Sequence, residues 1–523
     1  MTKRLLPAIP LLVGLYAPLY LWVRNVDDAS AGVALGVIGA SVALAAAVLG
    51  AALAAFRNVP RATAAATLVL ILFFLYGHAC GWAWRKGFST SLKTIYLVVG
   101  AVWLAIGGTG ILVLARSRRD WTRALGATGM TVGLLCAFAA VQLTFRLARR
   151  EDAQATRAVE EARAFAARPI GISRPPEREE RPDIYYIIAD GYARADVLRT
   201  HYGYDNAPFL DALRERGFFV ADRSCANYPF WTYLSIASSL SMAYLDESWV
   251  VRAEEREDRR PFIALVRGNR VSRFLKGRGY TYATTLTHHF VTEESETADV
   301  GFRFRSRILQ SEFAQEMIRT SLARLWEPHA AEEHRFALES VRRGPSLRKP
   351  LFFFAHFLMP HPPFVFDRHG NVRRDVPITL REKEQGPDGY LGQMEFLNGR
   401  LLELVDHLLR SSASPPIIVL QGDHGWVRPG MRLPEGLPGL LARVEQRGPI
   451  LNALRVPDRV KRRLSPDLTP VNTFRILLGE LFGADLPELE NRVYVYDPDA
   501  PSKIREVSRH LAEVWGTPET RGR

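Results

Sequence analysis

The sequence has little cysteine and shows no internal repeat or low-complexity tract. Only three of its 523 residues are cysteines, and Cys225 is the only one after residue 150. A lone cysteine excludes a disulfide within that part of the chain. Its folding must therefore depend on a hydrophobic core, which roughly 340 residues are enough to build.

Acidic residues are scarce in the first part of the chain, so the net charge of +13 is unevenly distributed. Residues 1–150 contain 15 Lys and Arg against 3 Asp and Glu, whereas residues 151–523 contain 53 against 52. The second part is thus nearly neutral. This balance argues against a basic nucleic-acid-binding domain, and we expect no nucleic-acid partner.

Charged residues are absent from five long apolar runs in the first part. They are residues 5–23, 31–56, 64–84, 94–115 and 124–145. A bilayer core needs about 20 helical residues, so the runs predict a five-span transmembrane domain over residues 1–146. The first run follows two basic residues, as a signal peptide does, but four further spans favour a retained anchor.

The basic residues in the loops predict the orientation of these spans. With the N-terminus in the cytoplasm, eight Lys and Arg lie in inside segments and four in outside loops. The positive-inside rule favours this arrangement, which places everything after residue 146 outside. Arg146, Arg149 and Arg150 lie just past the last span and oppose it.

The rest of the chain reads as an α/β domain behind a linker. Residues 147–182 form a helical and proline-rich linker, residues 183–500 the main domain, and residues 501–523 a C-terminal helix and tail. Four apolar strand segments alternate with helical stretches, at residues 183–189, 281–287, 350–357 and 415–422. The predicted fold class is an all-α transmembrane bundle followed by an α/β sandwich with a largely parallel sheet.

Polar residues follow each predicted strand. They are Asp190, then His288 and His289, then His361, and finally Asp423 and His424. In parallel sheets ligands bind beyond the carboxyl ends of the strands, so we expect these side chains to meet there. Carboxylate and imidazole groups suit Zn²⁺ or Mn²⁺, and Asp190, Asp423 and His424 are the candidate ligands of one divalent metal ion.

Two other residues have alternative interpretations. Thr232 opens a predicted helix, where the backbone amides and the helix dipole favour an anion. It is a candidate nucleophile, or else only the N-cap of that helix. His356 lies inside its strand and is interpreted as a packed, hydrogen-bonded core histidine.

Four segments resemble the alkaline phosphatase/sulfatase superfamily, at residues 182–196, 227–242, 359–366 and 421–425. With the five-span anchor, the chain resembles the membrane-anchored sulfatase-like hydrolase/transferase group, which includes lipoteichoic-acid synthases and phosphoethanolamine transferases. The resemblance implies an alkaline-phosphatase-like domain in which Thr232 is the nucleophile and touches the metal. It also implies that His361 contacts the transferred group and that His288 or His289 binds substrate.

Three departures from the family patterns restrict this resemblance. Lipoteichoic-acid synthases carry Glu where this chain has Asp190. Cys225 lacks the C-x-P-S-R context of sulfatases, so it is interpreted as an inert thiol. After His424 the only histidine is His510, near the terminus, so we expect one metal ion rather than two.

The sequence thus predicts a metal-dependent hydrolase or transferase in a bacterial cytoplasmic membrane, with its catalytic domain on the periplasmic side. It would act on phosphodiester (or sulfate ester) groups of envelope lipids or glycans through a covalent threonine intermediate. Loops such as 243–270 and 291–348 are expected to shape the substrate pocket. Two alternatives stay open: a sulfatase or phosphodiesterase that releases small products, and an inactive module for polysaccharide assembly. The oligomeric state is not predicted.

Overall fold

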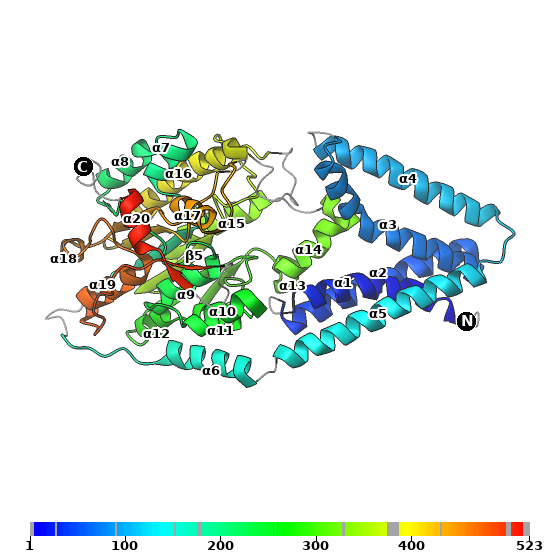
Figure 1. The fold of residues 1–523 in the computed structure, drawn as a ribbon, viewed down its shortest axis with the longest axis horizontal. Helices are drawn as coiled ribbons and strands as arrows, with labels where there is room; N and C mark the ends of the chain where they lie inside the picture. Colours follow the sequence, from blue (N-terminus) through cyan, green and yellow to red (C-terminus); the bar gives the residue numbers. More distant parts are fainter. Residues whose placement is uncertain are drawn as a thin grey trace. The chain divides into compact units, whose positions relative to one another are not determined.

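The computed structural model describes ten stretches of the chain: residues 5–26, 29–88, 92–150, 153–174, 180–256, 258–326, 330–373, 386–428, 431–497 and 504–515. The chain forms two compact units (Figure 1). One contains residues 1–153 together with residues 305–328, and the other contains the α/β domain.

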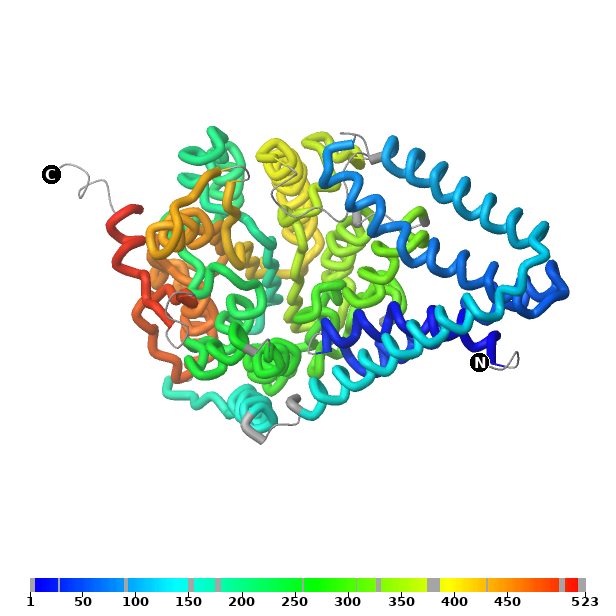
Figure 2. Tube along the Cα trace, turned by 45° about the vertical axis from the view of Figure 1, so that its right-hand side comes forward, coloured from blue at the N-terminus to red at the C-terminus, as the bar shows by residue number. Residues whose placement is uncertain are grey.

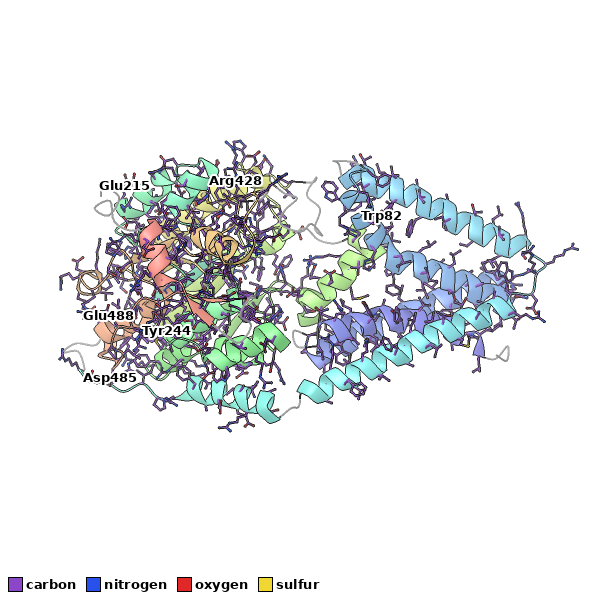
Figure 3. All side chains as sticks on the ribbon, in the orientation of Figure 1. Trp82, Glu215, Tyr244, Arg428, Asp485 and Glu488 are labelled. Atoms are coloured by element: carbon purple, nitrogen blue, oxygen red, sulfur yellow. The ribbon has the colours of Figure 1, made fainter. Side chains whose placement is uncertain are left out.

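The first unit is built on the five predicted apolar helices. They are α1 (Ala8–Arg24), α2 (Ala31–Phe56), α3 (Val59–Arg85), α4 (Leu92–Arg116) and α5 (Thr122–Arg150). Helices α2 to α5 are long and apolar enough to span a membrane, while α1 has 17 residues, at the short end of the usual range. Exposed apolar side chains such as Trp82 (Figure 3) and Leu104 fit a surface that faces lipid. These are the helices of a membrane protein.

A segment from the middle of the sequence packs against these helices. It comprises α13 (Arg307–Gln310), α14 (Glu312–Thr320) and the 3₁₀ helix η2 (Leu322–Trp326). Gly77 of α3 leaves the space that this contact needs, because a Cβ there would collide with the Arg319 carbonyl oxygen. The buried Arg324 side chain donates to the Gly77 carbonyl at 3.0 Å and to the Tyr96 hydroxyl at 2.9 Å. The expectation that residues 291–348 are loops around a substrate pocket therefore does not hold for this segment.

The second unit contains a seven-stranded sheet. Its strands are β1 (Ile184–Ala189), β2 (Phe219–Val220), β3 (Thr281–Leu286), β4 (Val300–Arg303), β5 (Leu351–Phe357), β6 (Ile417–Gly422) and β7 (Asn452–Arg455). The order is β2-β7-β6-β1-β5-β3-β4; β7 pairs antiparallel with β2 and with β6, and the other four pairings are parallel. The prediction of a largely parallel sheet is confirmed. Strands β1, β5 and β6 are buried along their whole length, which explains their nearly unbroken apolar sequences.

Helices cover both faces of this sheet (Figures 1 and 2). One face packs against α9 (Thr232–Ser241), α11 (Arg260–Arg267), α12 (Arg270–Lys276) and α19 (Pro470–Phe482). The other packs against α7 (Ala195–Tyr202), α8 (Ala207–Glu215), α15 (Ala330–Arg342) and α16 (Gly386–Ser411). Alternate residues of β1 supply the two cores, with Tyr186 and Ile188 in the first and Tyr185 and Ile187 in the second.

Shorter elements complete the unit. They are α6 (Ala153–Ala167), α10 (Glu247–Arg256), η3 (Gly344–Ser346), α17 (Gly436–Arg447), α18 (Asp458–Lys461), β8 (Tyr494–Tyr496), β9 (Ile504–Glu506) and α20 (Ser508–Trp515). Ala162 and Ala166 of α6 are buried in the first core, so the helix that follows the apolar spans is part of the α/β unit.

Candidate active site

Asp190 and Asp423 meet because their strands end at the same level. In the β1–β6 register Ala189 pairs with Gly422, so the next residue of each strand is an aspartate. Gly191 then turns the chain with φ of +75°, a conformation that glycine adopts at little cost. Its N–H donates to Asp423 Oδ1 at 2.9 Å. Both carboxylates are almost completely buried.

His424 joins the two carboxylates to form a candidate metal centre. One ligand atom from each residue lies within 4.8 Å of the others. His424 Nε2 is 3.6 Å from Asp190 Oδ1 and 3.4 Å from Asp423 Oδ2. Both of these buried oxygens lack a hydrogen-bond partner, which is costly unless a cation binds there. The donor set therefore fits a divalent metal ion.

The ring of His424 is oriented to offer a lone pair to this centre. Its Nδ1 lies 2.8 Å from the Gly425 carbonyl oxygen, to which only a protonated Nδ1 can donate. In the neutral ring Nε2 is then the free acceptor. A second hydrogen bond of this kind is the usual way in which proteins fix a metal-binding histidine.

Thr232 is brought to the same place from the first residue of α9. Its Oγ1 lies 3.3 Å from His424 Nε2. The N-cap position belongs to Trp231 and no side chain caps the helix, so the interpretation of Thr232 as an N-cap is wrong. Ser235, one turn later, donates its hydroxyl to the Asp423 carbonyl oxygen at 2.5 Å and ties α9 to the end of β6.

The charges of the centre shift the pKa values of its members in opposite directions. Burial and the negative charge of Asp190 raise the pKa of Asp423 to about 6. Burial also raises the pKa of Asp190, but His361, His356 and His424 outweigh it and lower the value overall. Burial, aided by Arg447, holds the pKa of His424 well below its ordinary value, so that ring is neutral.

His361 also lies at this edge of the sheet. Its backbone N–H donates to the Asp190 carbonyl oxygen at 2.9 Å, which fixes the turn after β5 to the end of β1. Its Nδ1 is 2.8 Å from the Pro362 carbonyl oxygen. The ring centres of His361 and His424 are 6.3 Å apart, and the edge of His361 meets Trp426 at 4.9 Å.

The two histidines after β3 have different surroundings. His288 Nδ1 lies 2.9 Å from Glu333 Oε2, and the pKa of Glu333 is lowered to about 2 because this histidine outweighs the effect of burial. His289 is stacked on Phe290, with ring centres 4.6 Å apart, and meets His356 edge-on. Burial lowers the pKa of His289 well below its ordinary value. Of these two histidines, only His289 therefore touches a side chain that borders the metal centre.

That bordering side chain is His356, which the sequence analysis left out of the site. It is fully buried and bonded to Thr292, as expected of a core histidine, but its Nε2 also lies 3.4 Å from Asp190 Oδ2. Its cross-strand partner is Ile188, which shares a face of β1 with Asp190. Knowing which strands are neighbours, and in what register, is needed to find this contact.

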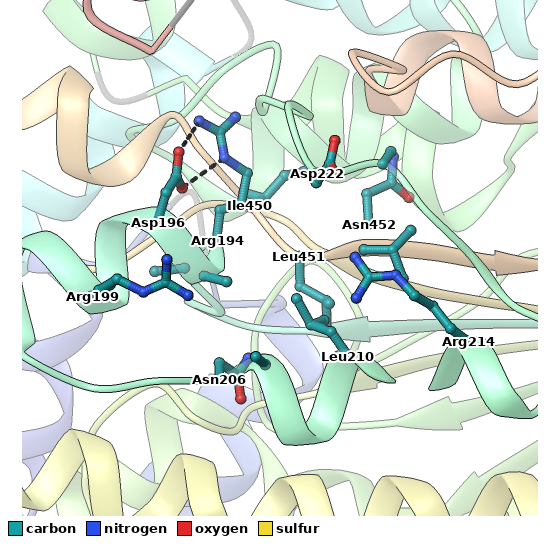
Figure 4. Close-up of a pocket in the computed structure, with 15 residues that line it drawn as sticks. Arg194, Asp196, Arg199, Asn206, Leu210, Arg214, Asp222, Ile450, Leu451 and Asn452 are labelled. Carbon is teal, nitrogen blue, oxygen red and sulfur yellow. Dashed lines mark hydrogen bonds and ion pairs between the residues drawn. The ribbon is translucent and has the colours of Figure 1, made fainter. Parts of the chain in front are cut away.

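A pocket of about 300 Å³ with both charged and apolar lining residues opens beyond the Asp190 turn (Figure 4). Arg194 there forms two hydrogen bonds with the Asp196 carboxylate, at 2.8 and 2.7 Å. The same guanidinium donates to the Ser224 carbonyl oxygen at 2.9 Å. These bonds hold the segment after Asp190 in place. The side chains of Arg199 and Arg214 also line the pocket.

Cys225 and His510 are the two residues that the sequence analysis considered but did not assign to the site. Burial raises the pKa of the Cys225 thiol, which keeps it in the unreactive form. His510 of α20 pairs with Glu445 of α17 at 2.7 Å. Within the described residues, the only cluster with metal-ligand geometry is that of Asp190, Asp423 and His424.

Comparison with known families identifies the type of domain. Residues 182–436 match the family model described as Sulfatase, so this part of the chain is similar to the domain of that family. No curated protein matches the sequence.

Similar solved structures include several bacterial envelope proteins. The C-terminal periplasmic domain of EptC from Escherichia coli is 12% identical over 64% of this chain and 96% of its own, with a TM-score of 0.40. The lipoteichoic acid synthase LtaP from Listeria monocytogenes is 12% identical over 65% of this chain and 83% of its own, also with a TM-score of 0.40. An alkaline phosphatase superfamily protein from Vibrio parahaemolyticus is 12% identical over 67% and 87%, with a TM-score of 0.39.

Proposed function

We propose that this protein is a membrane-anchored, metal-dependent enzyme that cleaves phosphodiester (or sulfate ester) groups of envelope lipids or glycans through a covalent intermediate on Thr232. The observation that carries the proposal is the convergence of Thr232 Oγ1, His424 Nε2 and two unpaired carboxylate oxygens at one buried point. A hydroxyl placed beside a cation site is the arrangement that a metal-activated nucleophile needs.

Asp190, Asp423 and His424 would hold one divalent ion, with Zn²⁺ or Mn²⁺ best suited to this donor set. When bound, the ion supplies Lewis-acid polarisation and lowers the pKa of a hydroxyl ligand. The first amides of α9 have no intrahelical acceptor and point toward an anion at Thr232. The protein thus provides positive potential where the transferred group would carry negative charge.

The reaction follows from these positions. Thr232 releases its hydroxyl proton to solvent, its Oγ attacks the phosphorus (or sulfur) atom, and the bond to the leaving-group oxygen breaks. His361, protonated on both ring nitrogens and with its Nδ1–H held by the Pro362 carbonyl oxygen, gives its Nε2 proton to the leaving oxygen and becomes neutral, with a bare Nε2. An acceptor hydroxyl, from water or from a lipid or glycan, then gives its proton to Nε2 of the neutral His361 and displaces Thr232, which leaves as the alkoxide.

The segment of α13, α14 and η2 that packs against the apolar helices supports an orientation that places the catalytic domain outside. Arg324 contacts Gly77, toward the C-terminal end of α3, and Tyr96, near the N-terminal end of α4. Residues 305–326, which lie between catalytic strands in the sequence, thus lie at the end of the bundle where α3 ends and α4 begins, the end that the α3–α4 loop joins. In the predicted topology that loop is outside, so we propose a cytoplasmic-membrane protein with a periplasmic active site.

The decisive experiment looks for the covalent intermediate. The full chain in lipid nanodiscs, loaded with Zn²⁺ or Mn²⁺, is mixed with a phosphodiester lipid and quenched in acid. Peptide mapping is expected to find a phosphoryl adduct on Thr232 and none in Thr232→Ala. Turnover by the wild type without an adduct under any quench condition contradicts the covalent mechanism.

Mass spectrometry of lipids and glycans separates the remaining alternatives. Cells with the active protein should contain a modified lipid or glycan that cells with Thr232→Ala lack. Release of a small product without a modified acceptor would favour a sulfatase or phosphodiesterase. A purified chain that binds no metal and shows no turnover would favour the inactive assembly module.

A further inference from the structure

His356 and Asp190 face each other on the side of the sheet that carries α9. His356 pairs with Ile188 across β1 and β5, and Ile188 and Asp190 lie two residues apart on one face. The His356 ring is fully buried and Asp190 is 2% exposed. Both groups are thus shielded from bulk solvent, so the protein groups around the ring dominate its hydrogen bonding.

Each ring nitrogen of His356 has one polar neighbour. Nδ1 lies 3.1 Å from the Thr292 hydroxyl, and Nε2 lies 3.4 Å from Asp190 Oδ2. Thr292 in turn lies 2.7 Å from the Thr287 hydroxyl, and Thr287 Oγ1 accepts the backbone N–H of His289 at 3.3 Å. The turn after β3 therefore carries a chain of two buried hydroxyls that ends on the ring.

The Asp190 carboxylate determines which group donates and which accepts in each of these hydrogen bonds. A bare Nε2 would direct its lone pair at Asp190 Oδ2, which is unfavourable without water to separate the two. A protonated Nε2 is attracted to that oxygen, although at 3.4 Å the contact falls outside the geometry of a regular hydrogen bond. Nδ1 is then the acceptor, so Thr292 must donate to it, and Thr287 must donate to Thr292.

This assignment is opposite to that of the two histidines nearby. Backbone carbonyl oxygens take the Nδ1 proton of His361 and of His424, and the Nε2 of each is bare when the ring is neutral. In His356 the assignment instead makes Nδ1 the acceptor and the Thr292 hydroxyl, 3.1 Å away, the donor. In the neutral rings, Nε2 of His361 and Nε2 of His424 therefore carry no proton, whereas Nε2 of His356 carries one and can donate it to a hydrogen bond.

We propose that His356 is a positioning residue for the metal centre. Held by the Thr287–Thr292 hydroxyl pair, it presents Nε2–H to Asp190 Oδ2 and thereby keeps Oδ1, which has no other partner, turned toward His424. The inference rests on the proposed role of Asp190 as a metal ligand. Groups that contact a ligating carboxylate from outside the ligand shell commonly tune metal affinity.

The test compares variants of His356 and Thr292 by the metal affinity of the full chain in nanodiscs, titrated with Zn²⁺ against a competing chelator. His356→Leu should weaken Zn²⁺ binding by roughly 10–100-fold. His356→Gln keeps an N–H donor at the end of the side chain and should restore most of the affinity. Thr292→Val should cost roughly 3–10-fold, the size of one neutral hydrogen bond, and Thr292→Ser should bind like the wild type.

Thr285→Val provides the matched control. Thr285 is also a buried threonine of the β3 segment, and its hydroxyl pairs with Ser340 at 2.6 Å, outside the hydroxyl chain. This variant should lose stability but not Zn²⁺ affinity. A merely structural role for Thr292 predicts that Thr285→Val and Thr292→Val behave alike, and that result overturns the proposal.

Asp190→Asn separates this inference from the proposed function. If Asp190→Asn binds Zn²⁺ as the wild type does, the ligand assignment fails and the role of His356 fails with it. If Asp190→Asn loses binding but His356→Leu and Thr292→Val do not, only the positioning role is overturned. Where His356→Leu does not fold, as judged by thermal unfolding, the Thr292→Val and Thr292→Ser pair decides the matter.

Discussion

The hydroxyl oxygen of Thr232 and Nε2 of His424 lie 3.3 Å apart, although 192 residues separate them in the sequence. Thr232 comes from the start of a helix and His424 from the turn after β6, two elements fixed to each other by the Ser235–Asp423 hydrogen bond. The proposed chemistry depends on this contact, because it places a hydroxyl at the mouth of a cation site.

Replacing the nucleophile should separate chemistry from metal binding. Thr232→Ala should abolish turnover of a phosphodiester substrate, because no other described hydroxyl has this position, while Zn²⁺ binding falls little. Thr232→Ser should keep measurable activity. Activity assays and metal analysis of the same preparations check this. Full turnover by Thr232→Ala would sink the assignment of the nucleophile.

Removing the metal should lower the stability of the α/β unit. Two buried carboxylates are left facing each other without a cation, and their ionised forms repel. At a free concentration 100 times the Kd, the ion should stabilise the fold by about 2.7 kcal/mol. The measurement is the shift in Tm on adding Zn²⁺ after chelation. Asp423→Asn should show no such shift, and a shift of equal size there would contradict the site.

Metal affinity should depend on pH through Asp423. Its pKa in the metal-free protein is raised to about 6, so below that pH the carboxyl holds a proton that the cation must displace. Above pH 6 the group is already ionised and no proton is released. Affinity for Zn²⁺ should therefore fall up to about tenfold per unit below pH 6 and level off above it.

His424 does not add to this dependence, because its pKa is held well below the ordinary value and the ring stays neutral in the same range. Titrations of the full chain between about pH 5 and pH 8 measure the effect. An affinity that is constant over that range would show that Asp423 is ionised throughout, or is no ligand.

His361 should affect rate more than metal binding. His361→Ala removes the proposed proton donor to the leaving group, and the expected loss in kcat is roughly 10²–10⁴-fold. Zn²⁺ affinity should stay within a few-fold of the wild type. His369→Ala, which removes an exposed histidine outside this cluster, is the control. Loss of metal from His361→Ala would make it a ligand instead.

Arg324 should stabilise the membrane unit. Its guanidinium is buried, donates to Gly77 and Tyr96, and lies 4.9 Å above the Tyr96 ring. Arg324→Gln leaves buried polar groups unpaired and should lower the free energy of unfolding by about 1–3 kcal/mol. Denaturation in nanodiscs and proteolysis within residues 305–326 are the readouts. Arg157→Gln, which breaks only an exposed pair with Glu161, should change stability by less than about 0.5 kcal/mol.

Much of the candidate site could be predicted because its residues are next to strand ends. Asp190, Asp423 and His424 each follow directly on an apolar run, and parallel strands bring such positions to one edge. The local sequence places Thr232 at the start of a helix, but it does not show whether Thr232 is the N-cap or the first helical residue. That distinction needed the backbone conformation of Trp231.

Two features could not be found in this way. His356 is separated from Asp190 by 166 residues, and its contact depends on β1 and β5 being neighbours in the observed register. The segment at residues 307–326 is too polar to be recognised as part of a membrane unit. Its amphipathic helix α14 buries Phe313 and Met317 in the same cluster as residues of the apolar helices.

The sequence by itself determined which segments are apolar helices, which are buried strands, and that metal-binding side chains follow those strands. Hydrophobicity and its period are local properties, and they are enough for these conclusions. Only the tertiary structure decided which strands are neighbours, which carboxylate oxygens are left unpaired, and which histidine lies against the Asp190 carboxylate. These depend on distances of a few ångströms between residues that are far apart in the chain, and no local pattern encodes them.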